Sequence, residues 1–283
     1  MRLASFIKDD TASYGIVRDD GIVDAGRRLG ANLPTLRQAL GDLDQVPALA
    51  GEAADFALAD VQLLPPIPDP HRLLCIGVNY RKHVEEVGHE VPDYPSIFAR
   101  CLDSIVGHGA DLVRPTASRQ YDFEGEFAIV IGSGGRHIPA EKAYDHVAGY
   151  TCFLDGSIRD FQFHTPTPHA GKNFWRSGAC GPWMVTREAM PEPPELTLTT
   201  RLNGEVMQQS GVADLIFDVP ELIAYLSTVA PLYPGDIIST GTPSGVGLAL
   251  DPQVWMKPGD TIEVEISGIG TLKNSVVDEA DLA

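Results

Sequence analysis

The sequence YDFEGEFAIVIG, residues 121–132, combines a predicted buried strand with a pair of acidic residues. Its second half is an apolar run of β-branched and aromatic residues that ends at a glycine, as is typical of a buried strand. Side chains alternate faces along a strand, so Glu124 and Glu126 point the same way, roughly 6–7 Å apart. Gly125 between them leaves space on the opposite face or permits close approach of another backbone segment.

Two carboxylates side by side at the start of a hydrophobic strand repel each other. Water, a basic partner or a cation must offset this repulsion, and paired carboxylate oxygens suit a hard divalent ion. A strand end with two solvated acids is the alternative, because the Glu-x-Glu pattern is common. Glu124 and Glu126 therefore give a metal-site hypothesis that other residues must support.

The composition predicts a soluble intracellular protein and argues against several classes of partner. Hydrophobic residues make up 43% of the 283-residue chain, as in globular proteins. The formal net charge of −18 argues against nucleic acid and anionic membranes as partners, because phosphate binding needs clustered Lys and Arg. The sequence contains neither a signal-peptide core nor an apolar run of the ~18 residues that span a membrane. The four cysteines show no C-x-x-C spacing, so we expect reduced thiols and a cytoplasmic location.

The chain is predicted to form a small N-terminal domain, residues 1–66, and a catalytic domain, residues 67–283. The N-terminal part contains short strand patterns and two modest helical patterns, of which the second covers residues 46–58. Four prolines between residues 65 and 70 exclude a helix or a central strand and place the boundary there. Because no chemically reactive side chains cluster in the N-terminal part, we expect it to be a structural cap.

A short helical pattern over residues 81–87 follows a predicted buried strand over residues 72–78. His83 and Glu86 are three residues apart, so they share a helix face and can form a hydrogen bond. A carboxylate beside an imidazole raises its basicity and fixes its tautomer, as a water-activating base requires. An exposed ion pair is the alternative interpretation. Residues 88–95 are rich in glycine and proline and are predicted to form a mobile lid.

Three further features can carry chemistry. Asp155 follows a predicted strand over residues 150–154, and it would complete a three-carboxylate site if this strand lies beside the strand after Glu124. Lys172 follows a glycine in an aromatic setting, so it is either a desolvated, substrate-facing ammonium or an ordinary surface lysine. Residues 241–247 form a glycine-dense loop after a strand, and its N–H groups can bind carboxylate or enolate oxygens.

Six motifs occur in order along the chain. They are Asn79-Tyr80-x-x-His83-x-x-Glu86, Glu124-Gly125-Glu126, Asp155-x-Ser157-x-Arg159-Asp160-x-Gln162, Gly171-Lys172, Gly181-Pro182-Trp183 and Gly241-Thr242-Pro243-x-Gly245-Val246-Gly247. This ordered series resembles the fumarylacetoacetate hydrolase family from about residue 70 to residue 277. The resemblance implies an α+β fold that is predominantly β, a mixed β-roll with a small N-terminal α/β cap domain. It also implies assembly as a homodimer.

The resemblance assigns a role to each candidate site residue. It implies a Mg²⁺ or Mn²⁺ ion, or sometimes Ca²⁺, with the ligands Glu124, Glu126 and Asp155. It implies that His83 and Glu86 form the water-activating pair, and that Lys172 contacts the oxygens of a 2-oxo acid substrate. The residues expected to line the substrate pocket are Tyr80, Arg159, Gln162 and Thr242.

Two positions depart from the family pattern. Leu154 stands where many relatives have an asparagine before the ligand aspartate, so the hydrogen bonds behind Asp155 differ. Arg100 stands where many relatives have a lysine in the strand after the lid. We expect these departures to affect substrate identity more than metal binding.

The implied reaction is hydrolysis of a C–C bond in a 2,4-dioxo acid of the acylpyruvate or fumarylpyruvate type, which releases pyruvate and a carboxylic acid. The metal and Lys172 would stabilise charge on the 2-oxo oxygen. His83, held by Glu86, would activate the water that attacks the 4-oxo carbon. An oxaloacetate-type decarboxylase and a keto–enol isomerase of a 2-hydroxy-diene-dioate are alternatives, because both form the same enolate. A non-catalytic acidic ion-binding protein is an alternative of another class.

Overall fold

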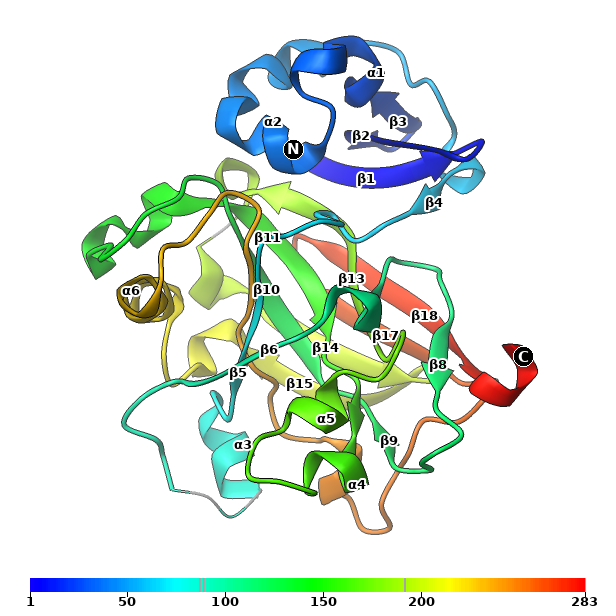
Figure 1. Ribbon diagram of the computed structural model, residues 1–283, viewed down its shortest axis with the longest axis vertical. Helices are drawn as coiled ribbons and strands as arrows, with labels where there is room; N and C mark the ends of the chain where they lie inside the picture. The colour runs from blue at the N-terminus through cyan, green and yellow to red at the C-terminus, as the bar shows by residue number, and fades with distance from the viewer. Residues whose placement is uncertain (87, 89, 191, 283) are drawn as a thin grey trace.

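The computed structural model describes residues 1–86, 88, 90–190 and 192–282. Val87 in the predicted helix and His89 in the predicted lid lie outside the described residues. Figure 1 shows a small N-terminal unit, drawn in blue, above a larger part that is rich in strands. No helix in the described ranges is both long enough and apolar enough to cross a membrane.

A large mixed sheet runs through both parts of the molecule. Its strands in spatial order are β3 (Gly21–Asp24), β2 (Thr11–Arg18), β1 (Arg2–Lys8), β13 (Gly178–Thr186), β11 (Val147–Leu154), β10 (Gly125–Ile131), β16 (Ile237–Ser239), β5 (Leu73–Gly77) and β6 (Ser96–Ala99), while β4 (Gln62–Leu63) pairs with β1 and β7 (Ile105–Val106) pairs with β13. Because β1 pairs with β2 on one side and with β13 on the other, the sheet continues across the two parts. The domain division at residue 66 stays a prediction.

A second sheet packs against the first and shares its hydrophobic core. Its strands in spatial order are β15 (Glu205–Gly211), β14 (Thr197–Leu202), β17 (Thr261–Ile266), β18 (Gly270–Asp278) and β8 (Leu112–Arg114), and the short strands β9 (Tyr121–Asp122) and β12 (Ser157–Ile158) pair with each other. Strand pairs in both large sheets are mostly antiparallel, with parallel pairs at β16–β5, β13–β7 and β18–β8. The expected α+β fold dominated by mixed sheets is confirmed.

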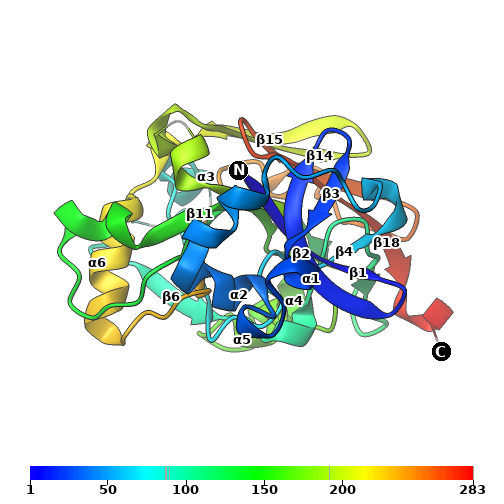
Figure 2. The same ribbon diagram turned by 90° about the horizontal axis from the view of Figure 1, so that it is seen from above.

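Most helices are short and lie in the connections between strands. The α-helices are α1 (Ala25–Leu29), α2 (Leu36–Ala39), α3 (Arg81–Glu86), α4 (Arg159–Gln162), α5 (His169–Lys172) and α6 (Val219–Val229). The 3₁₀ helices are Gly30–Asn32, Leu40–Gln45, Pro47–Leu49, Leu58–Asp60, Leu102–Ser104, Ala140–His146, Arg187–Ala189, Pro193–Glu195, Val212–Asp214, Gly247–Ala249 and Glu279–Leu282. In α6, a capping box between Asp218 and Glu221 satisfies backbone N–H groups at the helix start. Figure 2 shows α6 to one side of the N-terminal unit.

The predicted helix over residues 46–58 is wrong. The structure has only a 3₁₀ turn, Pro47–Leu49, and Phe56 instead forms a β-bridge with Ile22 in β3. Gly51 interrupts the helical pattern, because glycine costs about 1 kcal/mol relative to alanine inside a helix. Tertiary pairing with β3 therefore decides the conformation of this segment.

Strand β10 lies at the centre of the molecule, with β11 and β16 paired antiparallel on its two sides. All of its residues are buried. Phe127 and Ile129 pack in a core with residues of the second sheet, whereas Ala128 and Val130 pack in a core that includes residues of the N-terminal unit. The side chains of β10 therefore alternate between two cores, which confirms the predicted alternation. Because both faces of the strand are buried, consecutive residues from Phe127 to Ile131 are all apolar.

Gly125 lets the two sheets approach each other at the start of β10. A Cβ atom at this position would clash with the hydroxyl oxygen of Thr200 on β14, and it would also lie 3.3 Å from a methyl group of Val264 on β17. Any side chain here would push the second sheet away from β10. The glycine therefore sets the position of the chain between the two glutamates.

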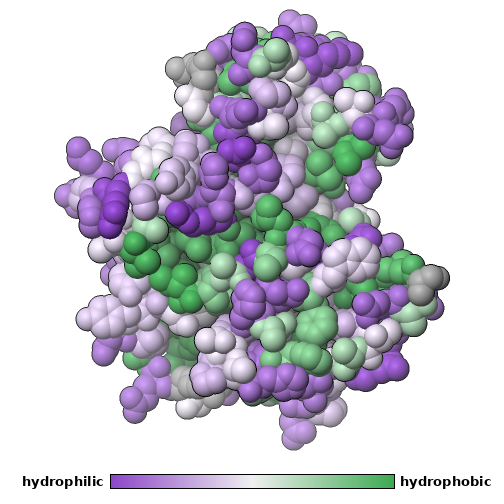
Figure 3. Space-filling view, in the orientation of Figure 1, coloured by the Kyte–Doolittle hydropathy of each residue, from purple (hydrophilic) through white to green (hydrophobic). Residues whose placement is uncertain are grey.

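A cavity of about 640 Å³ lies between the N-terminal unit and the larger part. Leu58, Val61 and Leu63 line it from one side, and His108 and Trp183 line it from the other. Hydrophobic residues also gather on the surface at the waist below the N-terminal unit (Figure 3). None of the predicted site residues lines this cavity, so the candidate site lies elsewhere in the molecule.

Candidate metal centre and active site

The register between β10 and β11 brings the predicted carboxylates together. Gly125 pairs with Leu154, and the N–H of Asp155 donates to the carbonyl oxygen of Glu124 at 2.9 Å. Ligand oxygens of Glu124, Glu126 and Asp155 lie within 4.8 Å of one another, and all three residues are buried. The two strands are therefore neighbours, as the three-carboxylate hypothesis requires, and the alternative of two solvated acids does not hold.

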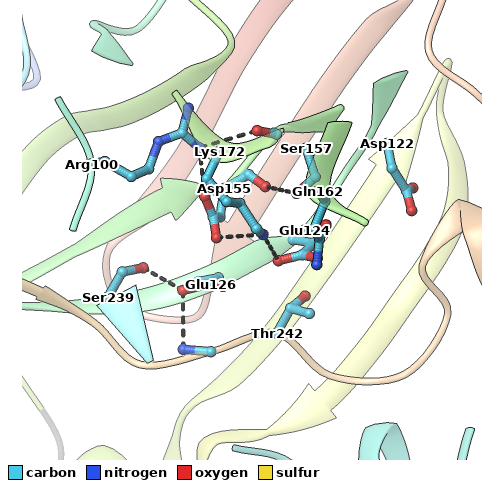
Figure 4. Close-up of polar contacts among 12 residues, drawn as sticks. Arg100, Asp122, Glu124, Glu126, Asp155, Ser157, Gln162, Lys172, Ser239 and Thr242 are labelled. Carbon is cyan, nitrogen blue, oxygen red and sulfur yellow. Dashed lines mark hydrogen bonds and ion pairs between the residues drawn. The ribbon is translucent and has the colours of Figure 1, made fainter. Parts of the chain in front are cut away.

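Lys172, at the end of α5, lies between two of these carboxylates (Figure 4). Its ammonium nitrogen is 2.6 Å from Oε2 of Glu124 and 2.7 Å from Oδ2 of Asp155, and the residue is 2% exposed. Burial alone would lower the pKa of Lys172, but the attraction of Asp155 and Glu124 outweighs burial, so the pKa is raised. Lys172 is a buried, charged residue and not an ordinary surface lysine.

Arg159, in α4, supplies a second cation to Glu124. Its guanidinium lies 2.7 Å from Oε1 of Glu124, so each oxygen of this carboxylate contacts a positive group. Burial would raise the pKa of Glu124, but the charges of Lys172 and Arg159 outweigh burial and lower the pKa to about 2. Glu124 is therefore ionised throughout the neutral range.

Arg100 supplies a second cation to Asp155, as Arg159 does to Glu124. Its Nη1 donates to Oδ1 of Asp155 at 2.5 Å and to the carbonyl oxygen of Gly156 at 3.1 Å, and its Nη2 donates to the hydroxyl of Ser177 at 2.7 Å. The side chains of Arg100 and Asp155 are almost completely buried. The planar guanidinium of Arg100 thus holds Oδ1 of Asp155, while Lys172 contacts Oδ2 of the same carboxylate.

Glu126 differs from its two neighbours because its contacts are with neutral groups. Oε2 accepts hydrogen bonds from the hydroxyl of Ser239 at 2.5 Å and from the N–H of Gly241 at 3.0 Å, both of them in or after β16. Burial and the repulsion of Asp155 and Glu124 raise the pKa of Glu126 well above its usual range. Among the residues in the described ranges, no cation forms an ion pair with Glu126.

With all four of its carboxylates ionised, the buried cluster would hold an excess of negative charge, and the raised pKa of Glu126 means that this residue takes up a proton unless a cation binds there. Its carboxylates are Asp122, Glu124, Glu126 and Asp155, and the cations that contact them are Arg100, Arg159 and Lys172. A divalent cation fits this donor set, since hard divalent ions are bound by carboxylate oxygens and Glu126 needs a positive partner.

His83 and Glu86 form the predicted hydrogen bond in α3. Nδ1 of His83 lies 2.9 Å from Oε2 of Glu86, while Oε1 of Glu86 accepts a hydrogen bond from the N–H of Gly245 at 2.8 Å. Glu86 thereby ties the helix to the glycine-dense loop. His83 is 7% exposed and lies close enough to the cluster to interact electrostatically with Glu124.

The turn that leads into α3 is held rigidly. Val78 has a φ of 57°, in the left-handed region that β-branched residues avoid. Asn79 holds this turn, because its side-chain amide donates to the carbonyl oxygens of Thr240 and Phe217 and accepts from the N–H of Phe217. Tyr80 follows, 1% exposed, and its hydroxyl has no hydrogen-bond partner among the residues that the structure describes.

The glycine-dense loop is fixed to the start of β10. The hydroxyl of Thr242 donates to the carbonyl oxygen of Gly125 at 3.0 Å. Gln208 on β15 donates to the hydroxyl of Thr242 at 2.8 Å and accepts from the N–H of Gly125 at 2.9 Å. Thr242 therefore lies beside the two glutamates, as expected for a residue near the substrate.

The remaining predicted substrate residues lie on α4. Gln162 accepts a hydrogen bond from Nη1 of Arg159 at 2.9 Å. The other terminal nitrogen of Arg159, Nη2, is buried and has no hydrogen-bond partner within the described part of the chain. A buried guanidinium N–H without a partner is costly, and an anionic ligand would satisfy it.

Three contributors to the cluster were not predicted as site residues. Asp122 accepts from Nε of Arg159 at 2.8 Å and from the N–H of Gly247 at 2.8 Å, so it links α4 to the glycine-dense loop. Arg100 holds Asp155, and Ser239 donates to Glu126. Asp122 could have been found, because strand alternation puts it on the same face as Glu124. The contacts of Arg100 and Ser239 depend on the three-dimensional pairing of distant strands.

Comparison with known proteins identifies the family. Residues 72–277 match the family model described as fumarylacetoacetate (FAA) hydrolase, C-terminal. The chain is 42% identical over 226 residues to oxaloacetate tautomerase YisK of Bacillus subtilis (strain 168), and the alignment covers 78% of this chain and 75% of the relative. The chain belongs to the fumarylacetoacetate hydrolase family. The predicted resemblance is therefore confirmed.

Solved structures of this family share the fold over nearly the whole chain. A crystal structure of maleylpyruvate hydrolase from Sphingobium sp. SYK-6, in complex with manganese(II) ion and pyruvate, superposes with a TM-score of 0.83 at 30% identity and covers 98% of this chain and 99% of that chain. The structure of 5-carboxymethyl-2-hydroxymuconate delta-isomerase from Mycobacterium smegmatis superposes with a TM-score of 0.79 at 32% identity and covers 99% of both chains. These relatives carry different reaction names on one fold.

Proposed function

We propose that this protein is a divalent-metal-dependent enzyme that forms the enolate of a 2-oxo acid, and that its reaction is keto–enol tautomerisation of oxaloacetate. The observation that carries the proposal is the buried carboxylate cluster with Lys172 inside it and the pair His83–Glu86 beside it. The identity of 42% to a relative named oxaloacetate tautomerase supports this choice of substrate.

The ligands of the metal would be Glu124, Glu126 and Asp155, which form the group of carboxylates close enough to share one ion. Carboxylate oxygens suit Mg²⁺ or Mn²⁺, with Ca²⁺ as a further candidate. When bound, such an ion polarises the 2-oxo group and makes the protons on C3 more acidic. Manganese and pyruvate in the complex of maleylpyruvate hydrolase support both a divalent metal and a 2-oxo acid ligand.

The residues of this chain would then move the proton. His83, oriented by Glu86, removes a proton from C3, and the electron pair of that C–H bond becomes the C2–C3 double bond. Lys172 donates a hydrogen bond to the 2-oxo oxygen, which acquires the negative charge. Transfer of the removed proton from His83 to this oxygen, through a water molecule, would give the enol, and the reverse sequence would return the keto form. Nη2 of Arg159 binds a carboxylate group of the substrate.

Hydrolysis of an acylpyruvate or fumarylpyruvate is the second candidate, because the hydrogen bond of 2.9 Å between His83 and Glu86 also suits activation of a water. The water would attack the 4-oxo carbon, the C3–C4 bond would break, and the electron pair would remain on the pyruvate fragment as its enolate. Lys172 stabilises the same oxygen in both reactions. The decarboxylase and the hydroxy-diene-dioate isomerase would use the same enolate position.

The test is to follow the ultraviolet absorbance of the enol forms of oxaloacetate and acetylpyruvate. EDTA-treated protein is assayed with and without added Mg²⁺ or Mn²⁺. We expect metal-dependent acceleration of oxaloacetate tautomerisation with the carbon skeleton intact. Formation of acetate and pyruvate from acetylpyruvate would instead assign the hydrolase, and release of CO₂ from oxaloacetate would assign the decarboxylase. Inactivity in all three assays would contradict the proposal.

We also propose that the protein is a cytoplasmic homodimer. The dimer is supported by the family resemblance, and the location is supported by four free cysteine thiols, of which three are buried. We propose neither nucleic acid nor membrane as a partner, because of the net charge of −18. Light scattering coupled to size-exclusion chromatography would test the dimer, with a mass of 30.5 kDa expected for the monomer.

A further inference from the structure

The ammonium of Lys172 contacts the carboxylates that the proposed metal would bind. We infer that Lys172 and the divalent ion compete for Oε2 of Glu124 and Oδ2 of Asp155. Metal binding would then displace the ammonium and free it to donate to the 2-oxo oxygen of the substrate. This inference rests on the proposed function, because it takes the metal ligands from that proposal.

The other oxygens of these two carboxylates are already held from outside the cluster. Oε1 of Glu124 contacts Arg159 at 2.7 Å, and Oδ1 of Asp155 contacts Arg100 at 2.5 Å. Both arginine side chains are at most 4% exposed and have further hydrogen bonds that fix their positions. The oxygens that remain for a shared ion are therefore the two that Lys172 contacts, at 2.6 and 2.7 Å.

The distances leave no room for both cations on the same oxygens without movement. A divalent ion of the proposed kind binds carboxylate oxygens at about 2.0–2.6 Å. An ammonium at 2.6–2.7 Å from the same two oxygens would lie almost at the position of that ion and would be repelled by it. The lysine side chain has four flexible carbons, so it can move while the backbone of α5 stays in place.

The ammonium has one further contact besides the two carboxylates. The ring of Phe98 on β6 has its centroid 5.4 Å from the ammonium nitrogen of Lys172, within the range of a cation–π interaction. Asn173, the next residue, anchors the end of α5 by accepting from the N–H of Cys101 and donating to the carbonyl oxygen of Ala99. The helix end is thus fixed while the ammonium has an alternative contact.

This arrangement predicts opposite effects of one substitution on binding and catalysis. Replacing Lys172 by methionine removes the competitor and also removes a positive charge next to the metal, and both changes favour metal binding. The same substitution removes the donor to the 2-oxo oxygen, so turnover falls. A lysine that only contacts substrate would lower turnover without changing metal affinity.

The experiment measures the Mn²⁺ affinity of EDTA-treated protein by isothermal titration calorimetry. The variants are Lys172→Met and, as a matched control, Lys273→Met. Lys273 forms an ion pair with Glu263 at 2.9 Å on the second sheet and is half-exposed. We expect the Kd for Mn²⁺ to fall roughly 10- to 100-fold in Lys172→Met, as neighbouring groups of metal ligands typically change affinity by this factor. The Lys273→Met variant should match the wild type.

Lys172→Arg provides a second test, which also serves if the methionine variant does not fold. It keeps the positive charge at the cluster, so its Kd should not fall. An equal or higher Kd in Lys172→Met than in a wild type that binds Mn²⁺ would overturn the inference and leave the proposed function intact. Equal tightening in the methionine and arginine variants would also overturn it. A wild type that binds no Mn²⁺ would overturn the inference and the proposed metal site together.

Discussion

Two ionic clusters in this molecule differ in their balance of charge. In the N-terminal unit, Asp55 forms ion pairs with both Arg27 and Arg28 and also accepts a hydrogen bond from the N–H of Asp24 at 2.8 Å. The cations outnumber the acid, and the side chain of Arg27 is 60% exposed. Each charge that is buried in this cluster has a partner, and the ion pairs hold α1 against the segment around Asp55.

The second cluster, between β10 and β11, is buried and incomplete. Glu124 and Asp155 each contact two cations, whereas the contacts of Glu126 with described residues are to neutral donors. Burying an unpaired carboxylate costs several kcal/mol. A cluster in which each acid has a cationic partner stabilises a fold, whereas a buried acid without such a partner is explained by a ligand of the missing charge. The comparison therefore separates a structural ion cluster from a functional one.

Changing Glu126 to glutamine should have the largest effect, because it removes the proposed metal ligand that has no cationic partner in the described part of the chain. We expect activity to fall by more than about a thousandfold, since the metal supplies several kcal/mol of charge stabilisation. We also expect the metal-free variant to be about as stable as the metal-free wild type at neutral pH, because the raised pKa of Glu126 leaves a neutral carboxyl group there and glutamine has nearly the same size.

Activity assays and urea unfolding of EDTA-treated protein would check this prediction. Asp55→Asn is the matched acid-to-amide control from the other cluster. A glutamine variant that retains activity, or that is much less stable than the metal-free wild type, would contradict this role of Glu126.

Replacing His83 by alanine should lower activity without changing the charge balance of the carboxylate cluster. We expect activity to fall roughly 10²–10³-fold, as is typical for loss of a general base, while the Kd for Mn²⁺ stays close to that of the wild type. Calorimetry and the enol assay on the same preparation would measure both quantities. The control is His146→Ala, a half-buried histidine whose side-chain hydrogen bonds are to Ser133. If His83→Ala abolishes metal binding, its role lies in the cluster itself.

Replacing Gly125 by alanine should disturb the functional cluster through packing alone. The new Cβ would clash with Thr200, and overpacking of a core typically costs about 1–3 kcal/mol. Because Gly125 separates Glu124 and Glu126, metal affinity should fall together with stability. Thermal unfolding with and without Mn²⁺ would measure both, with Gly51→Ala, where a Cβ meets no atom within 4 Å, as the control. Unchanged metal affinity would show that the cluster tolerates a shift of β10.

Changing Asp55 to asparagine should have the smallest effect and should spare function. We expect a loss of roughly 1–2 kcal/mol of unfolding free energy, with unchanged activity and metal affinity. The hydrogen bond from Arg28 lowers the pKa of Asp55 in the folded protein. Its contribution is therefore present above the unfolded pKa of about 3.9 and is lost as the pH falls below that value. Urea unfolding at pH 7 and pH 3 should show a smaller difference between wild type and variant at pH 3.

The features predicted correctly from the sequence are those encoded by local patterns. The apolar run after Glu126 predicts β10, because a buried strand needs little more than β-branched and aromatic residues. The spacing of His83 and Glu86 predicts their hydrogen bond, since residues three apart meet on a helix. Asp155 was placed at a strand end by the same reasoning, and the family resemblance completed the group.

The features that were missed depend on contacts between distant parts of the chain. Arg100 and Asp155 are 55 residues apart, and Ser239 and Glu126 are 113 apart, so no local pattern connects them. The segment 46–58 shows the same limit, because its bridge to Ile22 overrides a helical pattern. The charge balance of the cluster could therefore not be predicted from the sequence, because it depends on which distant strands pair with each other.

The most direct test of the account is the shift in unfolding temperature that Mn²⁺ produces in EDTA-treated wild type and in the Glu126→Gln variant. A ligand that binds the folded state stabilises it in proportion to the logarithm of its concentration over Kd. The account predicts a rise in the wild type that increases with Mn²⁺ concentration, and no rise in the variant. No rise in the wild type, or an equal rise in both proteins, would contradict the claim that the unbalanced cluster around Glu126 binds a divalent cation.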